Sequence, residues 1–334
     1  MFNITPATKH ELPSPPPDTI SSISWHPSSR CICATSWASE ARIWDFSTQI
    51  GQPVTQIKHD MPIFSSAFLN QQYVITVGAD KIVKMTDLST KTPMTIGQHE
   101  LPIRRVCAEQ SQNVILTGSW DKNVCIWNPS TPSTPTAKIP LPDRVYALDY
   151  RNPYFLVGTA DRHARMFDVR NMSKPVKDFD YKESPITCCK MNTRADGFVV
   201  GSNEGKVHVF NFPNSKIKKK EWTFRTQRVV DQKQTLIHTV NDMSYHPNGV
   251  LTTGGSDGTY TIWNVDLEVR CGYSQHDVKY PLPVTSLNFS PDGRFLAFAI
   301  GYDWEFGPPN ATAAQLAPHV YLHELKDFDV AKCK

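Results

Sequence analysis

The sequence predicts an all-β protein, a closed seven-bladed β-propeller with four-stranded blades, of which the seventh is degenerate. The first observation is a segment that recurs six times in the 334 residues: small residues, a turn that usually carries an acid, an alternating strand, and a closing Asp or Asn. The second observation is its period. The closing residue stands at positions 45, 87, 128, 168, 211 and 264, so copies are 40–43 residues apart until a last gap of 53. A period of about 40–45 residues is typical of propeller blades.

The best copies are "TSWASEARIWD" (35–45), "GSWDKNVCIWN" (118–128) and "GGSDGTYTIWN" (254–264). Their Trp-Asp or Trp-Asn ending is the signature of WD40 repeats. The acid in the turn is expected to accept backbone N–H bonds and to fix the hairpin. Another strand is expected upstream of each copy, for example at 102–109 and 144–150.

The seventh blade has to be assembled from less regular pieces. "PVTSLNFSPDGRFLAFAIGYDW" (283–304) resembles the start of a blade, with "SPDG" as its hairpin turn. "HVYLHEL" (319–325) is then its third strand, after an insertion at 305–318. The N-terminus is expected to supply the outer strand, because closing the ring removes free sheet edges. The predicted division is an N-terminal extension at 1–17, the propeller at 18–325 and a C-terminal tail at 326–334.

Composition limits the classes of function. A net charge of +3 is too small for nucleic-acid binding through the overall field, so electrostatic binding needs a local patch. No apolar run approaches the roughly 20 residues that span a bilayer, and no membrane partner is predicted. The eight cysteines form no CxxC pair, which favours reduced thiols in a cytosolic or nuclear protein.

The sequence contains no complete catalytic motif. "GGSDG" (254–258) matches the GxSxG pattern, but it aligns with the repeated blade turn instead of a strand-to-helix elbow. "GSNEGK" (201–206) is one residue short of a phosphate-binding loop. No HExxH occurs, and the eleven histidines are scattered. The sequence therefore predicts no enzyme, no metal and no cofactor.

Three tryptophans have different expected roles. Trp127 closes an alternating run and is predicted to lie in the core. Trp37 and Trp120 occupy turns, so they are expected to point toward one propeller face. There they serve either to bind a partner or to pack locally, and the sequence does not decide between these two uses.

The clearest departure from the period is the basic run "KIKKKEWTFRTQR" (216–228), within the 53-residue gap. One interpretation is a solvated hairpin tip anchored by its aromatic residues. The other is a site for an acidic peptide or a phosphate backbone. The run contains Lys216, Lys218, Lys219, Lys220, Arg225 and Arg228 against one acid, Glu221, with Trp222 and Phe224 between them.

Beyond the generic repeats, the chain resembles the nuclear-pore mRNA export factor family of WD40 propellers, from about residue 13 to 325. The more specific motifs are "GSWDK" (118–122), "PDRVYALD" (142–149) and "GYDW" (301–304). A close sibling is the mitotic-checkpoint propeller, which "HELPIRRV" (99–106) and "DVRNM" (168–172) resemble at least as much. "YDW" favours the export factor.

The resemblance implies a non-enzymatic adaptor that binds a GLEBS-type segment, short and partly acidic, of an FG nucleoporin and supports mRNA export. The alternative is a spindle-checkpoint adaptor that binds similar segments of kinetochore kinases. Direct contact with RNA or an mRNA ribonucleoprotein is a third possibility. The implied location is the nucleus and the nuclear pore at the nuclear envelope, with some protein in the cytoplasm, and the implied state is a monomeric propeller within a complex.

The resemblance also implies site residues. Lys206 stands where the family usually has Arg, which keeps the charge and loses the bidentate fork. The residues implied for the partner peptide are Trp37, Trp120, Lys206, Arg225 and Arg228. Candidates for a further face or an RNA edge, taken from the basic run and from the "YDW" motif, are Lys218, Lys219, Lys220, Trp222, Tyr302, Asp303 and Trp304. The sequence does not choose between nucleoporin and kinase partners.

Overall fold

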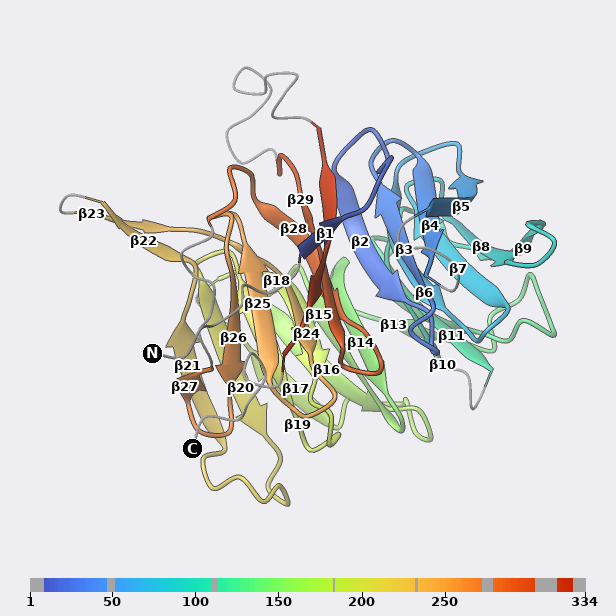
Figure 1. The fold of residues 1–334 in the computed structure, drawn as a ribbon. Coiled ribbons are helices and arrows are strands. Elements are labelled where there is room, and N and C mark those ends of the chain that lie inside the picture. Colours follow the sequence, from blue (N-terminus) through green and yellow to red (C-terminus); the bar gives the residue numbers. More distant parts are fainter. Residues whose placement is uncertain are drawn as a thin grey trace.

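The strands of this protein pair almost entirely with their neighbours in sequence, and they form seven antiparallel four-stranded blades in a ring (Figure 1). The predicted seven-bladed propeller is confirmed. The computed structural model describes residues 9–46, 52–109, 113–182, 184–231, 234–271, 279–303 and 317–326. No helix long and apolar enough to cross a bilayer occurs in these ranges.

The first four blades follow the chain without interruption. Blade 1 is β2 (Ile20–Trp25), β3 (Cys31–Ser36), β4 (Glu40–Asp45) and β5 (Gln52–Lys58). Blade 2 is β6 (Ile63–Phe68), β7 (Tyr73–Gly78), β8 (Ile82–Asp87) and β9 (Pro93–Gln98). Blade 3 is β10 (Ile103–Glu109), β11 (Val114–Ser119), β12 (Asn123–Trp127) and β13 (Ala137–Pro140). Blade 4 is β14 (Val145–Arg151), β15 (Tyr154–Thr159), β16 (His163–Asp168) and β17 (Lys177–Asp180).

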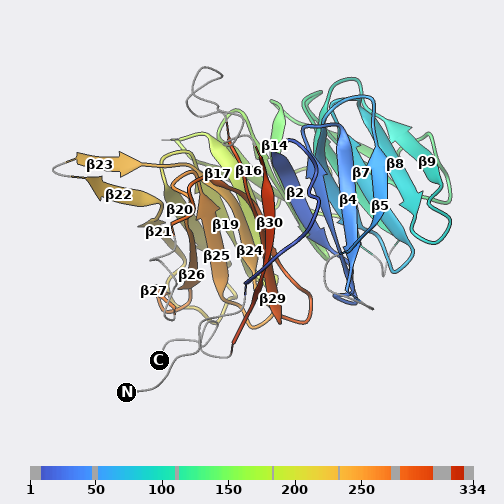
Figure 2. The same cartoon turned by 45° about the horizontal axis from the view of Figure 1, so that its top comes forward.

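An extra hairpin separates the fifth and sixth blades. Blade 5 is β18 (Ile186–Met191), β19 (Gly197–Ser202), β20 (Lys206–Asn211) and β21 (Glu221–Arg225). The hairpin is β22 (Arg228–Asp231) with β23 (Gln234–Ile237), and it projects from the ring (Figure 2). Blade 6 is β24 (Val240–Tyr245), β25 (Leu251–Gly255), β26 (Tyr260–Asn264) and β27 (Val269–Arg270). The hairpin therefore supplies the extra residues of the long gap. The basic run divides into two parts: its lysines lie in the hairpin loop between β20 and β21, as the hairpin-tip interpretation expects, and its next five residues form the outer strand β21.

The seventh blade joins the two ends of the chain. It consists of β28 (Val284–Phe289), β29 (Phe295–Ile300) and β30 (His319–Glu324), and its outer strand is β1 (Lys9–Glu11). In the antiparallel pairing, Lys9 lies opposite His323 and Glu11 opposite Tyr321. The next residue, Leu12, donates its N–H to the carbonyl oxygen of Val320 at 2.8 Å.

Both faces of each blade are buried against neighbouring blades. In β12, Val124 and Ile126 pack in the cluster between blades 3 and 4, whereas Cys125 and Trp127 pack in the cluster between blades 2 and 3. The alternating pattern thus separates two apolar interfaces instead of an apolar face and a solvated one. This arrangement explains why all four side chains are buried.

Trp127 is part of a buried hydrogen-bond network within blade 3. Its Nε1 donates to Oγ1 of Thr117 at 2.7 Å, and that hydroxyl also lies 2.7 Å from Nε2 of His99. The other ring nitrogen of His99 is 2.8 Å from the Asp121 carboxylate. Burial favours the neutral acid, but the hydrogen bonds from His99 and Asn123 outweigh it and lower the pKa of Asp121 to about 2. His59 links Asp80 to Thr76 in the same way in blade 2.

Candidate binding face

One face of the ring is defined by a hydrogen bond that recurs in every blade. The turn after the second strand donates a backbone N–H to the residue just before the first strand. The pairs are Trp37 to Thr19, Ala79 to Pro62, Trp120 to Pro102, Ala160 to Arg144, Asn203 to Pro185, Ser256 to Thr239 and Gly301 to Pro283. The end of the fourth strand returns to the same turn, as when Thr226 donates to Gly205 at 2.8 Å. We call this side the turn face.

The turn face carries an aromatic cluster over blades 1 to 3. The rings of Trp37 and Phe64 lie 5.0 Å apart, and those of Phe64 and Trp120 lie 5.8 Å apart. Trp37 is 45% exposed, while Phe64 is buried between the two tryptophans. The indole Nε1 of Trp120 is buried and has no acceptor in the described part of the chain. Trp37 and Trp120 therefore both pack against Phe64. The cluster combines this local packing with an indole N–H that has no acceptor among the described residues.

Phe64 is a member of this cluster that the sequence reasoning missed. It is the second residue of β6, in a stretch that reads as ordinary core. The signal that could have found it is its position relative to the turn tryptophans, since the starts of the first strands lie beside the turns of the same face.

A second group on the turn face is basic and lies between blades 5 and 6. Lys206 stands opposite Arg225 in the pairing of β20 with β21, and its Nζ is 3.0 Å from Glu204. Arg225 is exposed, whereas Arg228 is half-buried, with Nη2 3.4 Å from the carbonyl oxygen of Glu204. A cavity of about 430 Å³, which we call the basic pocket, opens here. Its lining includes Arg225, Gln227, Arg228, Trp263, Arg270 and Lys279.

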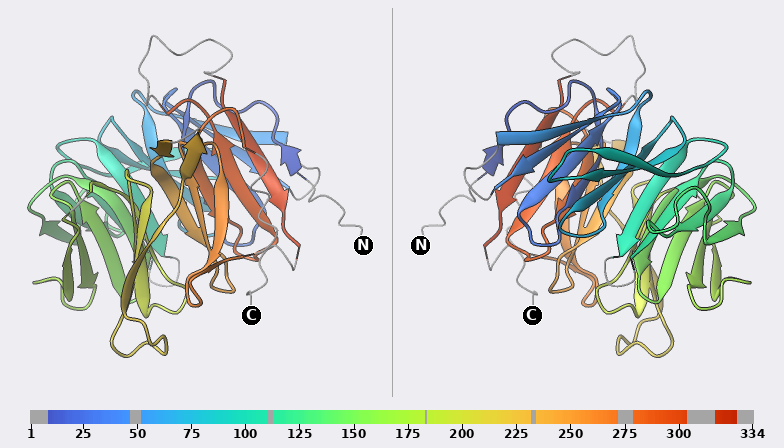
Figure 3. Two further views of the ribbon diagram at one scale, coloured as in Figure 1. Left: turned by 90° about the vertical axis from the view of Figure 1, so that its left-hand side faces the viewer. Right: turned by 90° about the vertical axis from the view of Figure 1, so that its right-hand side faces the viewer.

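The lysines of the same run lie on the opposite side of the ring. They belong to the loop 212–220, which projects from the lower edge in both views (Figure 3). Lys219 pairs with Glu268 at 2.7 Å, and Lys220 donates to the carbonyl oxygens of Ser215 and Ile217. Lys218 is exposed. The structure therefore does not bring Lys218, Lys219 and Lys220 together with Arg225 and Arg228.

Trp222 has a structural position between these two groups. It lies in β21, with its ring 5.2 Å from that of Phe224 and the Lys219 ammonium 5.2 Å above it. Both aromatic rings are half-buried against the cluster between blades 5 and 6. Both aromatic residues therefore anchor the outer strand to the neighbouring blade. Anchoring by these residues is what the hairpin-tip interpretation expects.

Tyr302 and Asp303 lie on the turn face beside blade 7. The carbonyl oxygen of Tyr302 accepts a bond from Oγ1 of Thr19 at 2.7 Å, and Tyr302 is buried. The Asp303 carboxylate accepts from Oγ of Ser256 at 2.6 Å. These contacts connect blade 7 to blades 1 and 6. Trp304 and most of the insertion at 305–318 lie outside the described residues.

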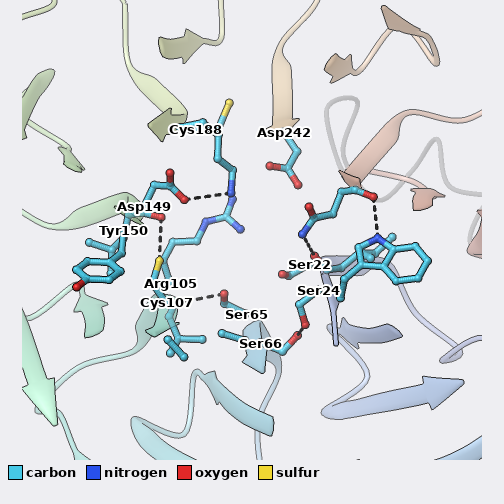
Figure 4. A pocket seen from close by; sticks show the side chains of 18 of the residues that line it. Ser22, Ser24, Ser65, Ser66, Arg105, Cys107, Asp149, Tyr150, Cys188 and Asp242 are labelled. Carbon is cyan, nitrogen blue, oxygen red and sulfur yellow. Dashed lines mark hydrogen bonds and ion pairs between the residues drawn. The ribbon is translucent and has the colours of Figure 1, made fainter. Parts of the chain in front are cut away.

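The first strands surround a central channel of about 300 Å³ (Figure 4). In this view the side chains of Arg105, Asp149 and Asp242 lie around it, whereas Cys188 packs in the cluster between blades 5 and 6. Lys190 lies 3.5 Å from Asp149. Burial raises the pKa of the Cys107 and Cys188 thiols to about 12, which leaves them protonated and poorly nucleophilic at neutral pH. No group of three side chains placed to hold a metal ion occurs in the described ranges.

Seven closed four-stranded blades define a WD-repeat propeller. The family model "WD domain, G-beta repeat" matches residues 8–45, 90–128 and 231–264. The chain is 32% identical over 321 residues to the mRNA export factor GLE2 of Chaetomium thermophilum, covering 91% of this chain and 87% of the relative. It belongs to the WD-repeat family of mRNA export factors, which has the mitotic checkpoint propellers as a close sibling.

Two further relatives represent both branches. The Poly(A)+ RNA export protein of Schizosaccharomyces pombe is 30% identical, with 96% of this chain and 91% of the relative covered. The mitotic checkpoint protein BUB3.1 of Arabidopsis thaliana is also 30% identical, with 92% and 91% covered. Overall identity therefore places this chain near both branches.

Proposed function

We propose that this protein is a non-enzymatic adaptor that holds a GLEBS-type segment of an FG nucleoporin across the turn face and supports nuclear mRNA export. The observation that carries the proposal is the pairing, on one face, of an aromatic cluster with a basic pocket. Relatives named as an mRNA export factor and as a poly(A)+ RNA export protein support the pathway. The proposal places the protein in the nucleus and at the nuclear pore, with some in the cytoplasm, as a single propeller within a complex.

The two groups suit the two kinds of side chain in a partly acidic segment. Trp37, which is almost half exposed, and Trp120 offer rigid apolar area that costs little conformational entropy on binding. Toward the turn face, the basic pocket has Arg225, Arg228 and Lys279 against one lining acid, Asp257, while Arg270 lies opposite Trp263 toward the other end of β26. Carboxylates of the segment would pair with these cations, and arginine allows bidentate geometry.

The checkpoint alternative has a specific observation in its favour. The relative named as a mitotic checkpoint protein is as similar to this chain, at 30% identity, as one of the export proteins. Both functions would use the turn face, so only the partner distinguishes them. An RNA contact through the lysines of loop 212–220 would lie on the opposite side and would be compatible with either partner.

Reversing two charges at the basic pocket is expected to weaken peptide binding about 10- to 100-fold. The variant is Arg225→Glu/Arg228→Glu, measured by calorimetry with a nucleoporin-derived and a kinase-derived GLEBS peptide. The matched control is Lys216→Glu/Lys218→Glu, which reverses two exposed charges of the same run on the opposite side. Preference of the wild type for the kinase peptide would assign the protein to the checkpoint branch. An equal loss of peptide affinity in the control variant would refute the basic pocket as the binding site.

Truncating the turn tryptophans tests the other half of the site. Trp37→Ala and Trp120→Ala are each expected to weaken the nucleoporin peptide about 30-fold, because buried tryptophans at an interface contribute about 2 kcal/mol or more. Leu267→Ala is the control, since Leu267 is 51% exposed in the loop after β26, away from the turn face. Unchanged affinity in both tryptophan variants would show that the aromatic cluster only packs locally.

A further inference from the structure

The hairpin of β22 and β23 is the one two-stranded sheet among the described residues, and it projects from the ring (Figure 2). A two-stranded hairpin is marginally stable at best in water, so it normally needs a third strand or a surface to pack on. All four residues of β23 are exposed, and Leu236 and Ile237 are each 46% exposed. Because an exposed apolar strand edge is a template for pairing with another strand, the hairpin has the features of a docking element.

The edge that is open to a further strand is that of β23. The other strand, β22, lies closer to the body of the propeller. Arg228 and Val229 are half-buried there, and Nη2 of Arg228 is 3.4 Å from the carbonyl oxygen of Glu204 in a turn of blade 5. On its far side, β23 has no paired strand in the part of the chain that the structure describes. A third strand would therefore add next to β23.

The register of the hairpin shows which backbone groups face the open edge. At its base, His238 donates its N–H to the carbonyl oxygen of Gln227 at 3.0 Å. The pairing of β22 with β23 continues from there without a bulge. In an antiparallel pair, the backbone groups of successive residues point alternately toward the partner strand and away from it. The N–H and C=O of Leu236 therefore face β22, whereas those of Thr235 and Ile237 face the open edge.

The hairpin is continuous with the basic pocket. β22 begins three residues after the end of β21, and Arg228 and Val229 are part of the pocket lining. Val229 lies directly opposite Leu236, so these two apolar side chains share one face of the hairpin. A segment that binds at the basic pocket and continues outward in an extended conformation can therefore reach the edge of β23 without leaving the protein surface.

We propose that the part of the bound GLEBS-type segment that lies beyond the basic pocket forms a β-strand on the open edge of β23. The hairpin then becomes a three-stranded sheet. The backbone groups of Thr235 and Ile237 supply the hydrogen bonds of this strand addition, and the exposed side chain of Leu236 packs against alternate side chains of the added strand. This inference rests on the proposed function and adds backbone recognition to it. The partner needs an extended, proline-free stretch with apolar residues at alternate positions.

Thr235→Pro tests the added strand, because it removes an N–H that faces the open edge. Proline is tolerated in an edge strand when its nitrogen faces solvent, so the hairpin itself is expected to form. Calorimetry should show about 10-fold weaker binding of a nucleoporin-derived GLEBS peptide. Thr235→Ala keeps the N–H and is the matched control, with an expected change of less than about twofold. Equal affinities of the proline and alanine variants would overturn the inference.

Shortening the peptide locates the strand. The peptide is truncated stepwise from each end, and each form is titrated against the wild type and Thr235→Pro. The difference between the two proteins should disappear once the strand-forming residues are removed from one end, because the two changes then remove the same contact. A difference that persists in every truncated peptide would mean that Thr235→Pro acts through the fold and would refute the added strand.

Amide hydrogen exchange tests the same contact without a variant. The N–H groups of Thr235 and Ile237 face solvent in the free protein, so peptide binding is expected to slow their exchange about 10-fold or more. Unchanged exchange at both residues in the bound wild type would remove this inference and leave the proposed function intact. Failure of the wild type to bind either GLEBS peptide would remove the proposed function together with this inference.

Discussion

Replacing Leu12 by alanine is expected to lower the free energy of unfolding by about 3 kcal/mol. Leu12 is 1% exposed and follows the strand that completes the seventh blade. It packs in the core cluster between blades 7 and 1, beside Ile20, Trp44 and Val320. Truncation removes these contacts and leaves a cavity that the backbone cannot easily collapse to fill. The backbone is held there because the Leu12 N–H donates to the carbonyl oxygen of Val320 and the carbonyl oxygen of Pro13 accepts from Trp44 Nε1. The seam of the ring should therefore be a sensitive point of the fold.

Urea unfolding followed by tryptophan fluorescence gives the measurement. Leu267→Ala is the matched control, because it removes the same atoms from a side chain that is 51% exposed and should change stability by less than about 0.5 kcal/mol. A loss below about 1 kcal/mol in Leu12→Ala would show that the N-terminal segment contributes little to ring closure.

Acidification from pH 7 to pH 4 is expected to cost about 3 kcal/mol of stability through His323 alone. His323 is 2% exposed in β30, and its Nδ1 lies 2.7 Å from the hydroxyl of Tyr260 in blade 6. Burial, with the charges of Lys9 and Lys326, lowers the pKa of His323 from 6.5 to about 4. The unfolded chain takes up its proton at the higher pH, so the contribution is complete above pH 6.5 and is lost as pH falls toward 4.

The pH dependence of unfolding in wild type and in His323→Gln isolates this group. The glutamine variant should be less stable at pH 7 and should lose less stability than the wild type between pH 6.5 and 4. Burial also lowers the pKa of His208, but that contribution is common to both proteins. The Asp121 carboxylate interferes little with this measurement. Its pKa is lowered from 3.8 to about 2, so the stability that it contributes is lost mainly below pH 4. Parallel curves for the two proteins would contradict the expected role of His323.

The sequence period was enough to predict the blades. Each copy of the repeat ends in the third strand of a blade, as β12 does at Trp127, and the turn residues Trp37 and Trp120 could be assigned to one face from that register alone. Both faces of a blade are buried, so apolar periodicity was a weaker guide than the spacing of the turns. The outer strands vary in length and composition, and β1 is too short to be recognised by pattern.

The basic run shows where proximity in sequence misleads. Between the lysines of the loop 212–220 and Arg225 lies β21, whose five residues cross the blade from one face to the other. At about 3.3 Å per residue, that strand separates the two groups of charge by roughly 17 Å. One run of the sequence therefore forms two separate patches, with different exposure and different partners.

Phe64 and Arg104 could not be identified from the pattern for a different reason. A bulge inserts one residue into a strand, so the alternation of inward and outward positions changes phase at that point. In the run "PIRRV", nothing distinguishes Arg104, the bulged residue whose guanidinium lies 5.8 Å from the Phe64 ring, from Arg105, which lines the channel. The assignment needs the register of the strand pairs.

The closure of the ring has a consequence for how the chain is made. Glu11 and His319, whose side chains approach to 2.6 Å across the last seam, are separated by 308 residues. At a synthesis rate of about 5–20 residues per second, the first strand waits roughly 15–60 seconds on the ribosome before its partner exists. During that time six blades can form in order, but the ring stays open, with sheet edges available for wrong pairing. Biogenesis of this protein should therefore be limited by its final strand, and protection of the nascent N-terminal segment should increase its yield.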